Sequence, residues 1–226
     1  MLKDTYDSIT ESLAGTFSKL TFTPTEQVYD AAGKRVLPPD TVRTIVDKQI
    51  AASGNKMEKW GDELKAVKGQ AGWSDAVDRW AVQFKEERRA LELQCSSAGR
   101  GGLHSTTIEA FDRAEAVNKQ QFKHIDEIVA KLKDDPDYVD SGRFENHGDA
   151  YARTARYSYE TEMGESHKDA GFLWEVSWHH AINSCAECER LDGVWVPIGT
   201  NVEPGSRECG PGCDCTQEFA RDNPDE

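Results

Sequence analysis

Hydrophobic residues in the first 165 positions recur at intervals of three and four, the spacing that places them on one face of an α-helix. Such stripes occupy residues 6–20, 42–67, 77–91 and 111–132. The first predicts a short amphipathic helix, and the others predict longer helices. We therefore expect this part of the chain to be a helical body.

Between the first two stripes, the sequence predicts a small hairpin or an extended arm. The segment EQVYDAAGKRVLPPD, residues 26–40, has two short apolar runs around DAAGK, a turn-like sequence that contains a glycine. Pro38 and Pro39 prevent the arm from continuing. Asp40 follows them and is the candidate N-cap of the next helix.

Polar and small residues mark the ends of the later helices. Ser74 is the candidate N-cap of the third stripe, and SSAGRGG at residues 96–102 is expected to end that helix. The GRGG within it lacks the lysine and the preceding strand of a phosphate-binding loop, so we interpret it as a linker. Thr106 and Glu109 have the spacing of a capping box, and DDPD around Pro136 is expected to end the fourth helix.

The hydrophobic period changes towards the C-terminus. Residues 141–163 still have a helical pattern, rich in Ala, Arg and Tyr. Phe172, Trp174, Val176 and Trp178 then occupy every second position, which predicts a strand with one buried face.

The fold class that these patterns predict is mainly α (α+β). Residues 1–165 form the helical body with its N-terminal arm or hairpin, and residues 166–226 form a small, cysteine-rich unit that contains β-structure. With 226 residues, the chain is long enough to bury a core without the help of disulfides.

The formal net charge of −14 narrows the range of partners. Binding to phosphates requires clustered Lys and Arg, so nucleic acid is a poor first candidate as a direct ligand. No window approaches the roughly 18 consecutive apolar residues of a membrane span, and the opening MLKDTYDSITESLAG lacks the regions of an export signal. We expect no membrane partner, and thiols that start in a reducing compartment.

Most of the cysteines lie in two clusters near the C-terminus. Cys185 and Cys188 have the two-residue separation of a zinc knuckle, and Cys209, Cys213 and Cys215 follow in a loop rich in glycine. Two distant groups of this kind suit a tetrahedral zinc site that closes a loop between them. We expect structural zinc bound by four of these five, the first pair plus two of the other three.

Other uses of these cysteines remain open. Disulfides could form in a particle that later meets oxidising conditions, although five clustered cysteines leave one unpaired. A catalytic zinc could be bound by His179 or His180. The simpler interpretation is that both histidines lie at the surface, at the end of the strand. A zinc deaminase is excluded, because no His is followed by Glu two positions later. A nucleic-acid-binding zinc ribbon is disfavoured, since residues 171–226 hold eleven Asp and Glu against three Lys and Arg.

Two further groups of residues have simple structural interpretations. His147, Asp149, Arg153 and Arg156 could form an acid–base site, but the helical spacing of the last three favours ion pairs within one helix. Cys95 falls on the apolar face of the third helix, where a buried cysteine behaves as a small hydrophobe.

Several short motifs follow one another in order between residues 142 and 215. They are ARTARY from Ala152, FLWEVS with Trp174, C-x-x-C-x-x-L-D-G from Cys185 and GPGCDC from Gly210. This order resembles the phage Mu F-like minor head protein family, also called phage head morphogenesis proteins. Members have an ARTE helix, a Trp-containing strand, C-x-x-C-x-x-L-D-G and a closing H-P-x-C-R-C.

The chain departs from this pattern at three positions. The family's His corresponds to Gly210, with Cys209 immediately before it as a candidate replacement ligand. Asp214 stands at the Arg of CRC, and Ala155 stands at the Glu of ARTE.

The resemblance implies a structural, non-enzymatic minor capsid protein of a tailed bacteriophage that acts in head assembly near the portal. The implied partners are the portal protein and the major capsid or scaffold proteins, with possible transient contact with packaged DNA. The implied location is the virion, in the capsid interior or at the portal vertex, and the host cytoplasm during assembly. Two alternatives belong to other classes. One is an enzyme or toxin-like effector, a nuclease or transferase built on the same zinc-stapled module, and the other is a regulatory zinc-ribbon protein.

Overall fold

The computed structural model describes residues 28–29, 35–36, 39–101, 106–179, 185–201, 204, 207–208, 213 and 215–225. The helix predicted at residues 6–20 lies outside this part of the chain, as do His180 and Cys209.

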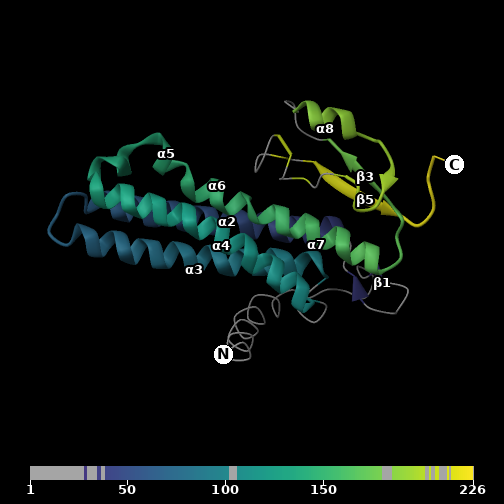
Figure 1. The fold of residues 1–226 in the computed structure, drawn as a ribbon, viewed down its shortest axis with the longest axis horizontal. Coiled ribbons are helices and arrows are strands. Elements are labelled where there is room, and N and C mark those ends of the chain that lie inside the picture. Colours follow the sequence, from purple (N-terminus) through teal and green to yellow (C-terminus); the bar gives the residue numbers. More distant parts are fainter. Residues whose placement is uncertain are drawn as a thin grey trace.

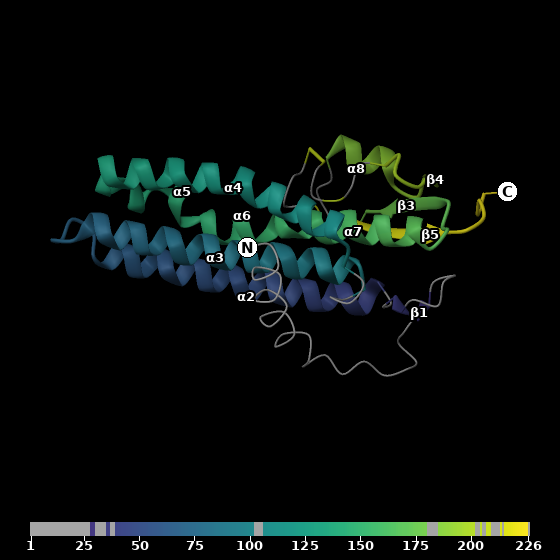
Figure 2. The ribbon, with the colours of Figure 1, turned by 60° about the horizontal axis from the view of Figure 1, so that its bottom comes forward.

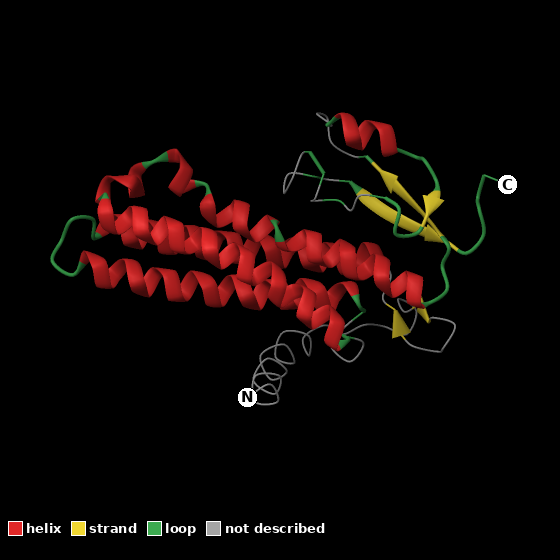
Figure 3. Cartoon of the chain, in the orientation of Figure 1, coloured by secondary structure: helices red, strands yellow, loops and turns green. Residues whose placement is uncertain are grey.

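The helices form an elongated bundle (Figures 1 and 3). Long helices lie side by side, and a line of shorter helices returns along them. The long helices are α2 (Pro39–Ala66), α3 (Trp73–Gly99) and α4 (Ile108–Asp134). The returning line consists of η3 (Pro136–Asp140), α5 (Gly142–Glu145), α6 (His147–Arg153) and α7 (Ala155–Asp169). The predicted mainly helical fold is confirmed.

Helix α3 is the central element of the bundle, because it packs against α2, α4 and α7 (Figure 2). Two apolar clusters fill the interior. One contains Trp80 and Phe84 of α3, and the other contains Leu91 of α3 and Tyr159 of α7. Arg88 lies between these positions on α3 and is fully buried. Two apolar clusters on either side of a buried ionic group therefore hold the bundle together.

Some helix ends differ from the sequence-based prediction. The N-cap of α3 is Gly72, with φ +88°, so the prediction of Ser74 was wrong. Thr107, one residue after the predicted Thr106, caps α4 by accepting a hydrogen bond from the Ala110 backbone N–H. Asp40 lies within α2, which begins at the preceding proline.

Helix α3 also continues beyond the predicted stop at residue 96. Ser96, Ser97 and Gly99 are helical and buried, although small residues of this kind usually favour a helix end. A Cβ added at Gly99 would lie 2.4 Å from the Tyr159 carbonyl oxygen. Close packing against α7 therefore outweighs the weak local helix propensity of this segment.

The single helix predicted at residues 141–163 is divided into α5, α6 and α7. Asn146 separates the first two helices, and Thr154 separates the second from the third. The Thr154 hydroxyl donates to the Tyr151 carbonyl oxygen (2.7 Å) and accepts a hydrogen bond from Nη2 of the buried Arg88 (3.0 Å). The break between α6 and α7 thus provides a hydrogen-bond acceptor for the buried Arg88.

The C-terminal unit is a small antiparallel sheet covered by a short helix. Strand β3 (Trp174–Trp178) lies between β4 (Val196–Pro197) and β5 (Thr216–Ala220), and α8 is the covering helix (Ala186–Leu191). A second, two-stranded sheet confirms the predicted N-terminal hairpin, with β1 (Val28–Tyr29) antiparallel to β2 (Arg35–Val36).

The prediction that β3 buries only one face was wrong. Glu175 and Ser177 are as buried as Val176 between them. The Glu175 carboxylate accepts hydrogen bonds from the backbone N–H groups of Gly199 (3.1 Å) and Asn201 (2.9 Å), so its burial is compensated. Both faces of this central strand are therefore covered.

The C-terminal unit lies against one end of the bundle, beside α7 (Figures 1 and 2). Helix α7 continues to Asp169, past the boundary predicted at residue 165. The ring of His167 on α7 stacks on Phe219 of β5, with centroids 4.2 Å apart and an angle of 14°. Phe219 also packs against the apolar cluster of α3 and α7. Among the described helices, none is long and apolar enough to span a lipid bilayer.

Candidate metal centre

Three cysteines from the two sequence clusters meet in the C-terminal unit. The Sγ atoms of Cys188, Cys213 and Cys215 all lie within 4.8 Å of one another. Each residue is buried, with at most 2% of its surface exposed. The predicted meeting of the two clusters is therefore confirmed for these three residues, and this arrangement can hold a metal ion.

Cys185 lies beside this cluster at the start of α8. It is the N-cap of the helix, and its Sγ accepts a hydrogen bond from the Cys188 backbone N–H (3.5 Å). Its side chain packs against the three buried cysteines. A hydrogen bond from a backbone N–H to the first sulfur of a Cys-x-x-Cys pair stabilises its thiolate form. Cys185 therefore lies next to the cluster, although the group whose sulfur atoms lie within 4.8 Å of one another contains only the other three cysteines.

The distance between the Cys188 and Cys213 sulfur atoms matches that between two ligands of one ion and is too long for a disulfide. Four sulfurs about 2.3 Å from one ion at tetrahedral angles lie about 3.8 Å from one another. The Cys188 and Cys213 Sγ atoms are 3.8 Å apart. A disulfide would bring them to about 2.05 Å, so these two cysteines are not joined.

The thiols in this cluster influence one another's protonation. Hydrogen bonding to Cys213, together with burial, raises the pKa of the Cys215 thiol far above its ordinary value. Close, buried thiols resist losing their protons because each new thiolate repels the next. A bound divalent cation reverses this preference, since its charge stabilises the thiolates.

Arg207 brings a positive charge to the cluster. Its side chain is buried, with 3% exposure, and Nη1 lies 3.8 Å from Cys188 Sγ. Burial opposes the charge, but the Cys188 sulfur and the neighbouring thiols still raise the pKa of Arg207. No sequence motif singles out this residue, although it is one of three basic residues in the acidic segment of residues 171–226.

The Leu-Asp-Gly sequence after the first cysteine pair ties the centre to the sheet. Leu191 is buried at the end of α8. The Asp192 carboxylate accepts a hydrogen bond from the His179 backbone N–H (2.8 Å), and the Gly193 N–H donates to the Ser177 carbonyl oxygen (2.9 Å). Gly193 has φ +69°, a conformation that glycine adopts without strain. These contacts fix α8, and with it Cys188, next to β3.

The remaining predicted site residues lie elsewhere. Cys95 is buried in the bundle, which confirms its interpretation as a small hydrophobe. Cys209 lies outside the described residues. His179 is not among the residues that the structure brings together as potential metal ligands.

The residues considered for an acid–base site do not converge. Asp149 and Arg153 form the predicted ion pair within one helix (2.7 Å). Arg156 lies near Glu160 instead (3.7 Å). His147 packs edge-on against Phe144 and Tyr151.

Comparisons with protein-family models, with curated proteins and with solved structures found no match for this chain.

Proposed function

We propose that this chain is a structural, non-enzymatic protein of a tailed-phage head that acts in head assembly near the portal. In this proposal, a zinc ion bound by Cys185, Cys188, Cys213 and Cys215 folds the C-terminal unit. The protein acts by binding other head components, and the zinc serves the fold.

The observation that carries the proposal is that separate parts of the family-like motif take part in one structure. The first cysteine pair caps and anchors α8, the Leu-Asp-Gly sequence ties α8 to β3, and two of the closing cysteines reach Cys188. Residues that are far apart in the sequence and match the motif thus form one compact unit. This is the arrangement expected if the unit is the conserved module that the resemblance suggests.

The chemistry of the ligand set favours zinc in a structural role. Sulfur ligands suit soft ions, and a closed set of four cysteines is typical of structural zinc sites. Catalytic zinc sites normally keep one position open and use histidine or carboxylate ligands. Bound zinc would supply the attraction that holds Cys213 and Cys215 next to Cys188 of α8.

The metal content of the purified protein tests the zinc centre. We expect about one zinc per chain and six free thiols after denaturation for the wild type. Cys188→Ser should lose the metal, while Cys95→Ala, which changes a cysteine outside the cluster, should keep it. A metal-free wild type with missing thiols would overturn the zinc centre in favour of disulfides.

Association with head components tests the assembly role. The chain would be co-expressed with the portal protein encoded by the same phage genome, and separately with its major capsid and scaffold proteins. We expect stable co-purification with at least one of them, lost in Cys188→Ser and kept in Cys95→Ala. Absence of binding to every head component would contradict the assembly role, even with zinc present.

Contact with packaged DNA, if it occurs in the assembled head, should be weak. The net charge of −14 opposes binding to a polyanion. We therefore expect little retention of the isolated protein on duplex DNA at low salt. Tight, salt-sensitive retention would favour a regulatory zinc-ribbon protein instead.

A further inference from the structure

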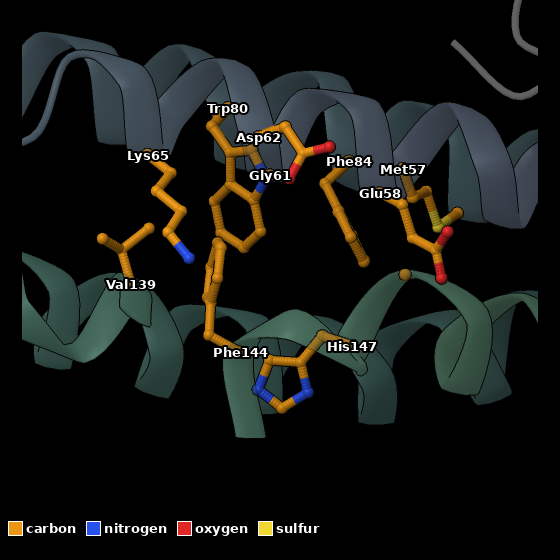
Figure 4. A pocket seen from close by; sticks show the side chains of 11 residues that line it. Met57, Glu58, Gly61, Asp62, Lys65, Trp80, Phe84, Val139, Phe144 and His147 are labelled. Carbon is orange, nitrogen blue, oxygen red and sulfur yellow. The ribbon is translucent and has the colours of Figure 1, made fainter. Parts of the chain in front are cut away.

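A pocket of about 300 Å³ opens at the surface of the bundle. Its lining residues fall between positions 57 and 148, so none of them belongs to the cysteine cluster. It lies between α2, α3 and the segment from η3 to α6 (Figure 4). Trp80 and Phe84 reach from α3 towards Phe144 of α5, and Glu58 and Asp62 belong to α2. A pocket of this volume is at the small end of the range for ligand sites, which is about 300–1,000 Å³.

Two glycines allow α2 and the returning helices to approach closely beside the pocket. At Gly148 the two are in direct contact, since an added Cβ would lie 2.8 Å from the Glu58 backbone nitrogen. One turn earlier, the large ring of Phe144 occupies the space between them. Opposite this ring α2 carries Gly61, where an added Cβ would lie only 3.4 Å from Phe144 Cε1.

Aromatic rings form the inner wall of the pocket. The rings of Trp80 and Phe144 have centroids 5.4 Å apart, and those of Trp80 and Phe84 are 5.1 Å apart, both at 45°. Trp80 and Phe144 are 3% and 5% exposed, so only the edges of these rings reach the pocket, where they give it an apolar lining.

The indole N–H of Trp80 is a buried donor without a partner. Trp80 is 3% exposed, and its Nε1 has no hydrogen-bond partner within the described ranges. The other buried tryptophan of α3 differs, because Trp73 Nε1 donates to the Leu132 carbonyl oxygen (2.8 Å). A buried donor without an acceptor is unfavourable, so the pocket favours an occupant with a free lone pair.

The rim of the pocket is negatively charged. Glu58 and Asp62 lie one turn apart on α2, and neither forms an ion pair within the part of the chain that the structure describes. Two like charges at this spacing repel each other. Lys65 also lines the pocket, but its Nζ pairs with Asp140 (3.3 Å).

The histidine of the pocket does not offset this charge near neutral pH. Burial, together with the charge of Lys131, lowers the pKa of His147 below its ordinary value. Its ring is therefore neutral at pH 7, and the carboxylates at the rim keep a net negative potential.

We propose that this pocket binds an arginine or lysine side chain presented by a partner protein. The aliphatic stem packs against the edges of Trp80 and Phe144 that line the pocket, and the cationic head binds Glu58 and Asp62. A peptide supplies both groups that the pocket lacks, a cation for the carboxylates and a carbonyl oxygen for the Trp80 N–H. The rim carboxylates are exposed, so a side chain can enter while its backbone remains at the surface.

The test is a titration of the full-length protein with a blocked tripeptide, acetyl-Gly-Arg-Gly-amide, monitored by the indole N–H resonances of the tryptophans. Trp80→Phe identifies the resonance of Trp80. We expect a saturable shift of this resonance and no shift of the Trp73 resonance. The same peptide with neutral citrulline in place of arginine should bind about fivefold or more weakly, since it cannot pair with the carboxylates.

Rim variants separate binding from folding. Glu58→Gln combined with Asp62→Asn should lower the affinity for the arginine peptide about fivefold or more. The protein should stay folded, because the change removes a repulsion between two carboxylates. Glu63→Gln changes a carboxylate that pairs with Lys59 outside the pocket, and it should leave the affinity unchanged.

Three results would overturn the proposal. The first is the absence of a saturable Trp80 shift, and the second is equal affinity for the arginine and citrulline peptides. The third is equal affinity for agmatine, which carries the guanidinium without a peptide, because the pocket would then be a site for small free cations. None of these outcomes depends on the metal centre or on the role in head assembly.

Discussion

Arg207 shows how one side chain can adjust the charge of the metal centre. In the proposed centre, four thiolates around one Zn²⁺ would carry two net negative charges, and the buried cation next to Cys188 would offset part of this charge. We expect Arg207→Met, which keeps the volume of the stem, to weaken zinc binding about tenfold or more. Arg207→Lys should retain most of the affinity.

Competition with a chromophoric chelator measures this effect directly. Wild type, Arg207→Met and Arg207→Lys would be compared at one pH and ionic strength. Equal zinc affinity for all three would mean that the arginine only fills space next to the cysteines.

Glu92 makes the stability of the bundle depend on pH. Burial raises the pKa of its carboxyl to about 7, although Arg88 and Ser158 contact it. Between pH 4.5 and 7, the folded protein therefore holds a proton that the unfolded chain has lost. The contribution of Glu92 to the free energy of unfolding is therefore fully present below pH 4.5 and is lost as the pH rises to 7. The total loss is about 3 kcal/mol.

Glu92→Gln isolates this contribution, because glutamine cannot titrate. The free energy of unfolding would be measured with urea at pH 5 and at pH 7.5. Between these two pH values, the free energy of the variant should rise by up to about 3 kcal/mol relative to that of the wild type. The same difference between the two proteins at both pH values would contradict a raised pKa.

At the residue scale, the sequence predicted those site residues whose role depends on local spacing. Of the cysteines that the spacing singled out, Cys188, Cys213 and Cys215 meet, and Cys185 lies beside them as the N-cap of α8. Arg207 and Glu175 were missed, because their partners come from other elements. A lone buried arginine acquires its role only when the loop that carries it folds against α8.

At the scale of the helices, two glycines provide a test of packing against propensity. A Cβ added at Gly99 would lie 2.4 Å from the Tyr159 carbonyl oxygen, and 2.9 Å from the Met163 backbone nitrogen. Since these are backbone atoms of α7, the two helices would have to move apart. We expect Gly99→Ala to destabilise the protein by about 1–3 kcal/mol.

Gly164 on α7 is the matched control. An added Cβ there meets no heavy atom within 4 Å. Gly164→Ala should therefore raise the free energy of unfolding by about 0.5–1 kcal/mol, because alanine has the higher helix propensity. The midpoints of urea unfolding should therefore shift in opposite directions for the two variants. A stabilising Gly99→Ala would mean that α3 and α7 are not in close contact at this point.

The same helices explain what periodicity could and could not predict. Regular apolar spacing on α2, α3 and α4 was sufficient to identify each helix, because these helices bury one face along most of their length. Their ends were less predictable. The end of α3 depends on Gly99 packing against a helix about sixty residues later, and the break at Thr154 depends on the buried Arg88. Such tertiary contacts override local propensity.

At the scale of the whole molecule, the bundle and the C-terminal unit have different sources of stability. The bundle has two apolar clusters of its own. The described interior of the C-terminal unit is centred on the cysteines, and its sheet has short strands. The contact of Phe219 with His167 joins the two parts. Loss of the metal should therefore destabilise the C-terminal unit far more than the helical bundle.

Chelation tests this difference. A strong zinc chelator should leave most of the helical circular-dichroism signal and the main melting transition in place, because neither apolar cluster contains a metal ligand. Limited proteolysis with intact-mass analysis should then show new cleavage after Gly171 and little within α7. Cys188→Ser should give the same pattern without the chelator. Loss of the helical signal on chelation, or rapid cleavage within α7, would mean that the centre stabilises the bundle as well.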